Sequence, residues 1–91
     1  MGRISETFFK LEKLNKKALI AYIVAGDPSL ESTARVMELM VGHGVDIIEL
    51  GIAFSDPMAE GTSVQRGHER ALINGTSLEE VLELVKEFRK I

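Results

Sequence analysis

The sequence contains no cysteine and no tryptophan, and it has only two prolines and one tyrosine. Without cysteine, a disulfide framework and a thiolate metal site are both excluded, which is typical of a protein from a reducing compartment. The sequence also has no apolar run of about 18 residues and no signal-peptide core, so it supports neither membrane spanning nor secretion. We therefore expect a cytoplasmic protein.

The charge balance is mildly acidic. Eleven basic and fourteen acidic side chains give a formal net charge of −3. This balance offers no electrostatic reason to bind nucleic acid or an anionic membrane, and we expect neither partner. A hydrophobic fraction of 45% and a charged fraction of 27% are typical of a globular chain. At this length it forms one domain at most, with a modest core.

Apolar periodicity predicts alternating helices and strands. An apolar stretch over 18–25 has apolar residues on both alternating faces, which is typical of a strand in a parallel sheet covered by helices. The predicted elements, in order, are an amphipathic helix over 5–14, a strand over 18–25, a helix capped by Ser29 and ended by Gly42 and Gly44, a strand over 45–50, a loop over 51–62, a helix over 64–73, and a last helix with a capping box from Thr76 or Ser77 to Glu79 or Glu80.

This order makes a right-handed βαβ unit in the first part of the chain. The sequence stops at Ile91, where the alternating pattern calls for a third strand. Two parallel strands cannot bury both sheet faces or pair both edges, so we expect exposed apolar surface. We interpret residues 1–91 as a single incomplete domain, whose sheet is completed either by chain that has been cut away or by another copy.

One carboxylate, Glu49, lies near the carboxyl end of the second predicted strand. A buried ionised carboxylate is costly, so Glu49 either reaches water at the strand end or acts as an acid or base in a cleft. The carboxyl ends of parallel strands carry the active sites of α/β sheets and barrels. Glu60 follows in the predicted loop, and two carboxylates in different surroundings suit proton transfer. A solvated loop glutamate is the alternative for Glu60.

Asp27 and Tyr22 are two further candidates, and the two histidines are not. Asp27 can cap the helix that follows it or help to bind a phosphate at the start of that helix. Tyr22 lies in the first strand, either in the core or in the wall of a pocket next to Glu49. His43 and His68 lack metal-ligand spacing, so we assign neither a role and predict no metal site.

Three strings of the sequence resemble one known family. AGDPS, IELGIAFSDPMAEG and QRGHERALINGTSLEEVLELV, in this order, resemble the amino-terminal part of the tryptophan synthase alpha chain. Because that family folds as a (βα)8 barrel, the resemblance implies an α/β fold that is part of a TIM barrel, a leading helix followed by two parallel βα units. It also implies a lyase of tryptophan biosynthesis that cleaves indole-3-glycerol phosphate to indole and glyceraldehyde 3-phosphate by a retro-aldol step.

The resemblance further implies partners and residue roles. The family's beta chain, its partner in an alpha2-beta2 tetramer, carries pyridoxal phosphate, and the alpha chain needs no cofactor. Glu49 matches the family's proton-transfer glutamate, and Glu60 stands where the family has an aspartate that faces the indole nitrogen. Asp56 matches a residue used in signalling across the alpha–beta interface. Tyr22 stands where the family commonly has phenylalanine against the indole.

Other parts of the family's site come from later strands, including the loops that grip the substrate phosphate. We therefore expect that this chain alone does not turn over substrate. The alternative interpretation is a non-catalytic barrel fragment, which acts as an assembly module by forming a homo-oligomer or by complementing the missing portion. A third, an unrelated two-layer binding protein, leaves the three strings unexplained.

Overall fold

The computed structural model of this chain describes residues 2–53 and 61–90. Its elements, in order, are α1 (Arg3–Lys13), β1 (Ile20–Val24), α2 (Leu30–Gly42), β2 (Ile47–Gly51), α3 (Thr62–Ile73) and α4 (Leu78–Phe88). The predicted types and order of these elements are confirmed. The bounds differ by a few residues, and both ends of the predicted loop belong to regular elements, since Gly51 closes β2 and Thr62 opens α3.

The two strands form a parallel sheet with α2 as the connection between them. In its register, Tyr22 lies opposite Glu49 and Val24 lies opposite Gly51. Side chains alternate between the two faces of a sheet, and directly opposite residues share a face. Tyr22, Glu49 and Gly51 therefore belong to one face, while Ile48 and Leu50 belong to the other.

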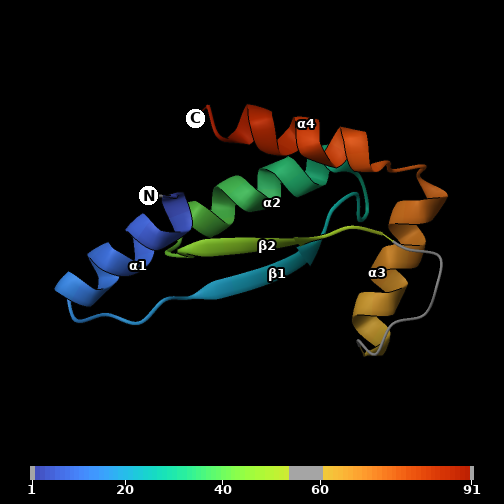
Figure 1. The fold of residues 1–91 in the computed structure, drawn as a ribbon. Helices are drawn as coiled ribbons and strands as arrows, with labels where there is room; N and C mark the ends of the chain where they lie inside the picture. Colours follow the sequence, from blue (N-terminus) through green and yellow to red (C-terminus); the bar gives the residue numbers. More distant parts are fainter. Residues whose placement is uncertain (1, 54–60, 91) are drawn as a thin grey trace.

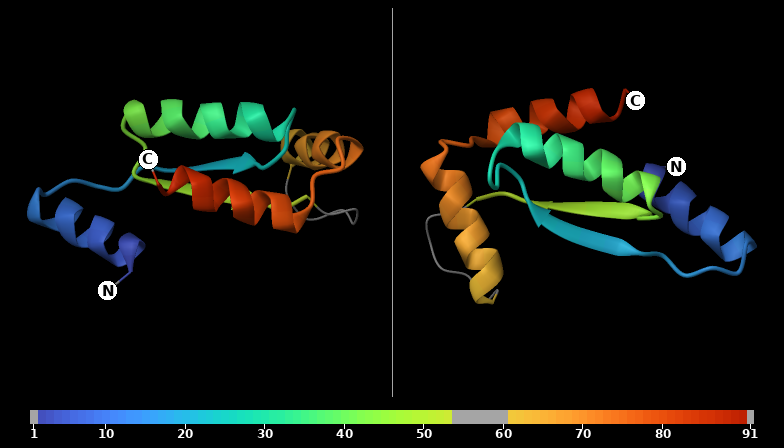
Figure 2. Two further views of the ribbon diagram at one scale, coloured as in Figure 1. Left: turned by 90° about the horizontal axis from the view of Figure 1, so that it is seen from above. Right: turned by 180° about the vertical axis from the view of Figure 1, so that it is seen from behind.

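The helices cover the sheet unequally. Helices α2 and α4 lie side by side along one face, and α3 crosses the carboxyl ends of the strands (Figures 1 and 2). In the described ranges, no helix lies along the opposite face (Figure 1). The sheet is therefore covered on one face only, and the architecture is a leading helix followed by two parallel βα units, as expected for part of a (βα)8 barrel.

The buried core is small, and much apolar surface stays exposed. Among the described residues, the buried apolar ones are Val24, Ala25, Met37, Ala71 and Val81. Helix α1 is amphipathic as predicted, but it has no buried residue, and Ile4, Phe8 and Leu14 are exposed. The expectation of exposed apolar surface is confirmed. No helix in the described part of the chain is long and apolar enough to cross a bilayer.

Local side-chain hydrogen bonds define two of the helix starts. The Ser29 hydroxyl accepts from the Ser32 N–H at 3.1 Å at the start of α2. The predicted capping box at α4 is confirmed, with Ser77 and Glu80 as its members. Asp27 does not cap α2, so that prediction is wrong. The N-cap position belongs to Ser29, and the Asp27 carboxylate binds a side chain of α3 instead.

The turn after β1 packs tightly against the segment between α3 and α4, and a pair of glycine variants tests this packing. Gly26 has φ of 93°, and a Cβ there would lie 2.1 Å from Oγ1 of Thr76. Gly44 has φ of 104° but open space around it. Alanine at either position costs about 1–2 kcal/mol in backbone strain, and at Gly26 overpacking adds about 1–3 kcal/mol.

We therefore expect Gly26→Ala to lower the free energy of unfolding by about 1–3 kcal/mol more than Gly44→Ala does. Urea denaturation followed by far-UV circular dichroism measures both variants. Equal losses in the two variants would contradict the close approach of Gly26 and Thr76.

Candidate functional site

The uncovered face of the two strands, from Tyr22 and Glu49 at their middle to Gly51 at the end of β2, and the inner side of α3 form the candidate site, here called the strand mouth (Tyr22, Glu49, Gly51 and His68). Glu49 is exposed, but it is the middle residue of β2 and not, as the sequence predicted, a residue near its end, so its carboxylate reaches water from the uncovered face of the sheet. Tyr22 is 39% exposed and lies opposite Glu49. Of the two alternatives for Tyr22, the pocket wall therefore fits the structure, and the core does not.

The Tyr22 ring extends along the sheet over Gly51. A Cβ on Gly51 would lie 2.0 Å from the Tyr22 hydroxyl oxygen, so only glycine leaves room for the ring. The same hydroxyl lies 3.4 Å from Nε2 of His68 on α3. The two side chains are 46 positions apart in the sequence and meet because α3 crosses the strand ends.

His68 is the functional candidate that sequence reasoning missed. It is only 7% exposed. The sequence did indicate that His68 lies on the apolar face of a helix, because Val64, His68 and Ala71 recur at the spacing of one helix face. That face packs on the end of β1, whereas His43 is exposed after the end of α2. Position on the apolar face of a helix would have distinguished the two histidines.

Three polar side chains hold α3 against the turn after β1, and together they are called the latch (Asp27, Arg70 and Asn74). Nε of Arg70 donates to Oδ1 of Asp27 at 2.5 Å, and Nη2 donates to Oδ2 at 2.9 Å. The Asn74 amide donates to the carbonyl oxygen of Pro28. Two-pronged pairing of a guanidinium with a carboxylate fixes orientation as well as distance.

The latch is charged at neutral pH. The hydrogen bonds from Arg70 lower the pKa of Asp27 below its ordinary value of 3.8, against a smaller opposing effect of partial burial. The same hydrogen bonds raise the pKa of Arg70. The Asp27 side chain is 19% exposed and that of Arg70 is 53% exposed. Water and salt therefore weaken the attraction, and the directional hydrogen bonds matter more than the net charge.

Two of the predicted site residues, Asp56 and Glu60, lie outside the described residues. Of the predicted site residues, the structure therefore brings Glu49 and Tyr22 together at the strand mouth, with His68 added. Within residues 2–53 and 61–90 no three histidine or acidic side chains are grouped so that they could hold a metal ion.

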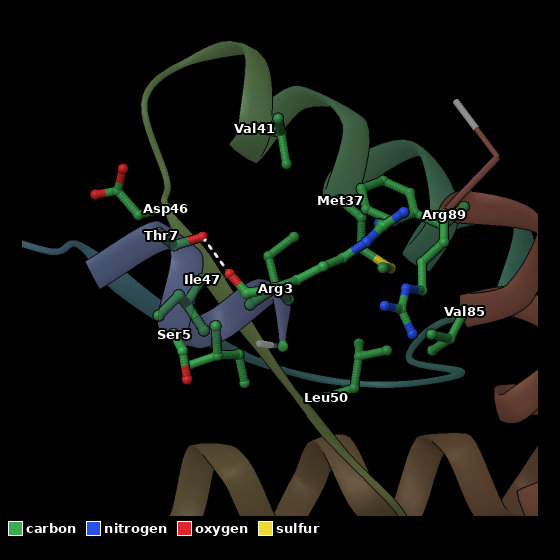
Figure 3. A pocket seen from close by; sticks show the side chains of 14 residues that line it. Arg3, Ser5, Thr7, Met37, Val41, Asp46, Ile47, Leu50, Val85 and Arg89 are labelled. Atoms are coloured by element: carbon green, nitrogen blue, oxygen red, sulfur yellow. Dashed lines mark hydrogen bonds between the residues drawn. The ribbon is translucent and has the colours of Figure 1, made fainter. Parts of the chain in front are cut away.

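A large cavity lies away from the strand mouth. It has a volume of about 530 Å³ and lies between α1, the helix-covered side of β2, and the ends of α2 and α4. Figure 3 shows Arg3 and Arg89 extending into it, with Leu50 and Val85 in its apolar wall. None of its lining residues belongs to the strand mouth. A smaller cavity of about 270 Å³ borders the mouth, and Tyr22 and Asp27 are among its lining residues.

The geometry agrees with comparisons to known proteins. The family model described as tryptophan synthase alpha chain matches residues 8–91. The tryptophan synthase alpha chain of Xanthomonas axonopodis pv. citri is 54% identical over 90 residues, which are 99% of this chain and 34% of that protein. The chain thus spans about a third of the length of the curated relatives it matches.

Solved structures show the same likeness. Tryptophan synthase subunit alpha from Legionella pneumophila superposes with a TM-score of 0.95 at 50% identity, over 99% of this chain and 34% of that one. A chain from the tryptophan synthase alpha2-beta2 complex of Pyrococcus furiosus superposes with a TM-score of 0.73 at 48% identity, over 80% of this chain and 29% of that one.

The ion pair between Asp27 and Arg70 makes the stability of the fold depend on pH. The pKa of Asp27 is lower in the folded chain than in the unfolded chain, so its ion pair stabilises the fold fully above about pH 3.8. This stabilisation is lost as the pH falls from there through the folded pKa. We expect Asp27→Asn to lower the urea midpoint at neutral pH, and the gap to the unaltered chain to close in acid.

Urea midpoints measured from neutral to acidic pH test this expectation. Glu83→Gln, an exposed change on α4, is the control and should leave the midpoint close to that of the unaltered chain throughout. A gap between Asp27→Asn and the unaltered chain that stays the same at every pH would show that the Asp27 charge is not what stabilises the turn.

Proposed function

Because this chain belongs to the tryptophan synthase alpha chain family, we propose that it forms the first two βα units of a barrel that cleaves indole-3-glycerol phosphate. The observation that carries the proposal is the register of the sheet, in which Tyr22 and Glu49 lie opposite each other at the middle of the two strands, with the Tyr22 ring extending toward their carboxyl ends over Gly51. An aromatic ring beside a carboxylate on one face of a parallel sheet suits an aromatic substrate that must exchange protons.

Glu49 has the proton-transfer role in this proposal. The retro-aldol step breaks the bond between the indole ring carbon and the glycerol side chain. The glycerol hydroxyl loses its proton as its carbon becomes the aldehyde of glyceraldehyde 3-phosphate, and the ring carbon gains a proton to give indole. No water is consumed. One carboxyl group can take the first proton and supply the second, which is general acid–base catalysis.

Two further roles fall on residues outside the described part. Glu60, in place of the family's aspartate, is proposed to face the indole nitrogen. Its side chain is one methylene longer, and a displacement of about 1 Å can cost roughly a hundredfold in rate. Asp56 is proposed to lie at the interface with the beta chain. That partner, in an alpha2-beta2 tetramer, would carry the pyridoxal phosphate and take up the indole. The cytoplasmic location expected from the sequence stays a prediction.

Catalysis by this scheme needs more than the described site. In this chain Glu49 is exposed, so it lacks the excluded water and fixed surroundings that make a positioned acid effective. We propose that activity requires the rest of a barrel, and that 1–91 is one incomplete domain of it. A second candidate, the assembly module, is favoured by the exposed apolar residues of α1 and of β1, among them Phe8 and Ile20.

A complementation assay tests the proposal and the role of Glu49 together. The purified chain is mixed with the carboxyl-terminal remainder of a full-length relative, and indole release from indole-3-glycerol phosphate is measured. We expect no release by the chain alone and release by the mixture. In the mixture, Glu49→Gln should lower kcat by about 10²- to 10⁴-fold, the usual value of a positioned acid or base.

Glu83→Gln is the matched control for loss of one carboxylate, and its mixture should keep the rate of the unaltered chain. Equal rates with Glu49→Gln and Glu83→Gln would contradict the role of Glu49. A stable complex without indole release would favour the assembly module. Indole release by the chain alone would contradict the need for the remainder.

A further inference from the structure

His68 is a buried titratable side chain that has no part in the proposed reaction. It is 7% exposed, and its Nε2 lies 3.4 Å from the Tyr22 hydroxyl. Removing an imidazole from water is costly unless its nitrogens make hydrogen bonds in the protein. The position of this side chain against Tyr22 therefore needs a physical reason.

The Tyr22 hydroxyl lies where two elements constrain it. On the sheet, the missing side chain of Gly51 provides its space, since a Cβ there would lie 2.0 Å from the hydroxyl oxygen. On α3, Nε2 of His68 is within hydrogen-bond reach. Depending on the tautomer of His68, the phenol donates to Nε2 or the Nε2–H donates to the phenol oxygen. In both cases the tyrosine ring is held at its far end.

Helix α3 is in turn held independently of Tyr22. A Cβ on Gly67 would lie 2.9 Å from Oδ2 of Asp27, so α3 approaches the turn after β1 closely. Arg70, on the same helix, and Asn74, at its C-cap, also bind this turn. His68 lies between Gly67 and Arg70 in the sequence, so the latch fixes the part of the helix that carries the imidazole.

We infer that His68 is a positioning residue, which holds the Tyr22 hydroxyl over Gly51 and thereby fixes the tyrosine ring beside Glu49. The consequence for catalysis rests on the proposed function, in which this ring is the wall against the indole of the substrate. A wall that is already fixed loses little conformational freedom when a flat ligand packs on it. His68 therefore contributes to substrate binding through Tyr22 and takes no part in proton transfer.

The sequence makes Tyr22 easy to observe, because the chain has one tyrosine and no tryptophan. The tyrosine band in the near-UV circular dichroism spectrum therefore reports on the Tyr22 ring alone. His68→Gln and His68→Asn differ by one methylene. The glutamine amide reaches about as far as Nε2, whereas the asparagine amide reaches only as far as Nδ1. We expect His68→Gln to keep most of the tyrosine band and His68→Asn to lose it, with unchanged far-UV spectra.

His43→Asn is the matched control, because His43 is exposed after α2, and it should leave the tyrosine band unchanged. Gly51→Ala tests the position of the Tyr22 hydroxyl by the same near-UV measurement. Its methyl group would take the place of the hydroxyl while His68 stays intact, so we expect it to change the band as well. Equal tyrosine bands in His68→Gln and His68→Asn would overturn the inference, as would a band that Gly51→Ala leaves unchanged.

Kinetics of the complemented enzyme separate this inference from the proposed function. His68→Asn should raise KM for indole-3-glycerol phosphate by about 2- to 10-fold, the value of one hydrogen bond, with kcat nearly unchanged. A loss in kcat at constant KM would overturn the inference. If the unaltered mixture releases no indole, the proposed function fails, while the difference between the glutamine and asparagine bands still supports the positioning of Tyr22 by His68.

Discussion

The parallel pairing of β1 with β2 is the constraint on which the rest of the structure depends. Its register brings Tyr22 opposite Glu49 and sets Gly51 where the tyrosine ring needs space. A slip of one residue would turn every side chain of one strand to the other face. Glu49 would then point toward the helices, and Tyr22 would lose the gap over Gly51. The candidate site follows from this register, and α3 only completes it.

The uneven covering of the sheet explains why the site is formed but open. Helices α2 and α4 cover the face that carries the half-buried Ile48 and Leu50 (Figure 1), whereas Tyr22 and Glu49 on the other face are exposed. The latch ties α3 to the turn after β1 and thus keeps the strand ends in order without a covered inner face. The positions of the side chains in the strand mouth and the exclusion of water from it are therefore separate properties. This chain has the positions of the side chains, but its strand mouth is open to water.

Features that depend on residues close together in the sequence could be predicted, and contacts between residues far apart in the sequence could not. The capping box of Ser77 and Glu80 spans one helical turn, so residue types and spacing were enough to predict it. Asp27 was misassigned because a local cap is the usual role of an aspartate before a helix, while its true partner, Arg70, lies 43 positions away. The meeting of His68 with Tyr22 likewise depends on the path of α3. Asp56 and Glu60 lie outside the described residues, so their roles stay predictions.

The most direct test of this account is a nuclear Overhauser measurement on the purified chain, between the ring protons of its one tyrosine and its two histidines. The account predicts cross-peaks from Tyr22 to His68 and none to His43, together with contacts between β1 and β2 in the register of Tyr22 and Glu49. Strand contacts without any cross-peak between Tyr22 and His68 would contradict it, because α3 would then not be held over the strand mouth.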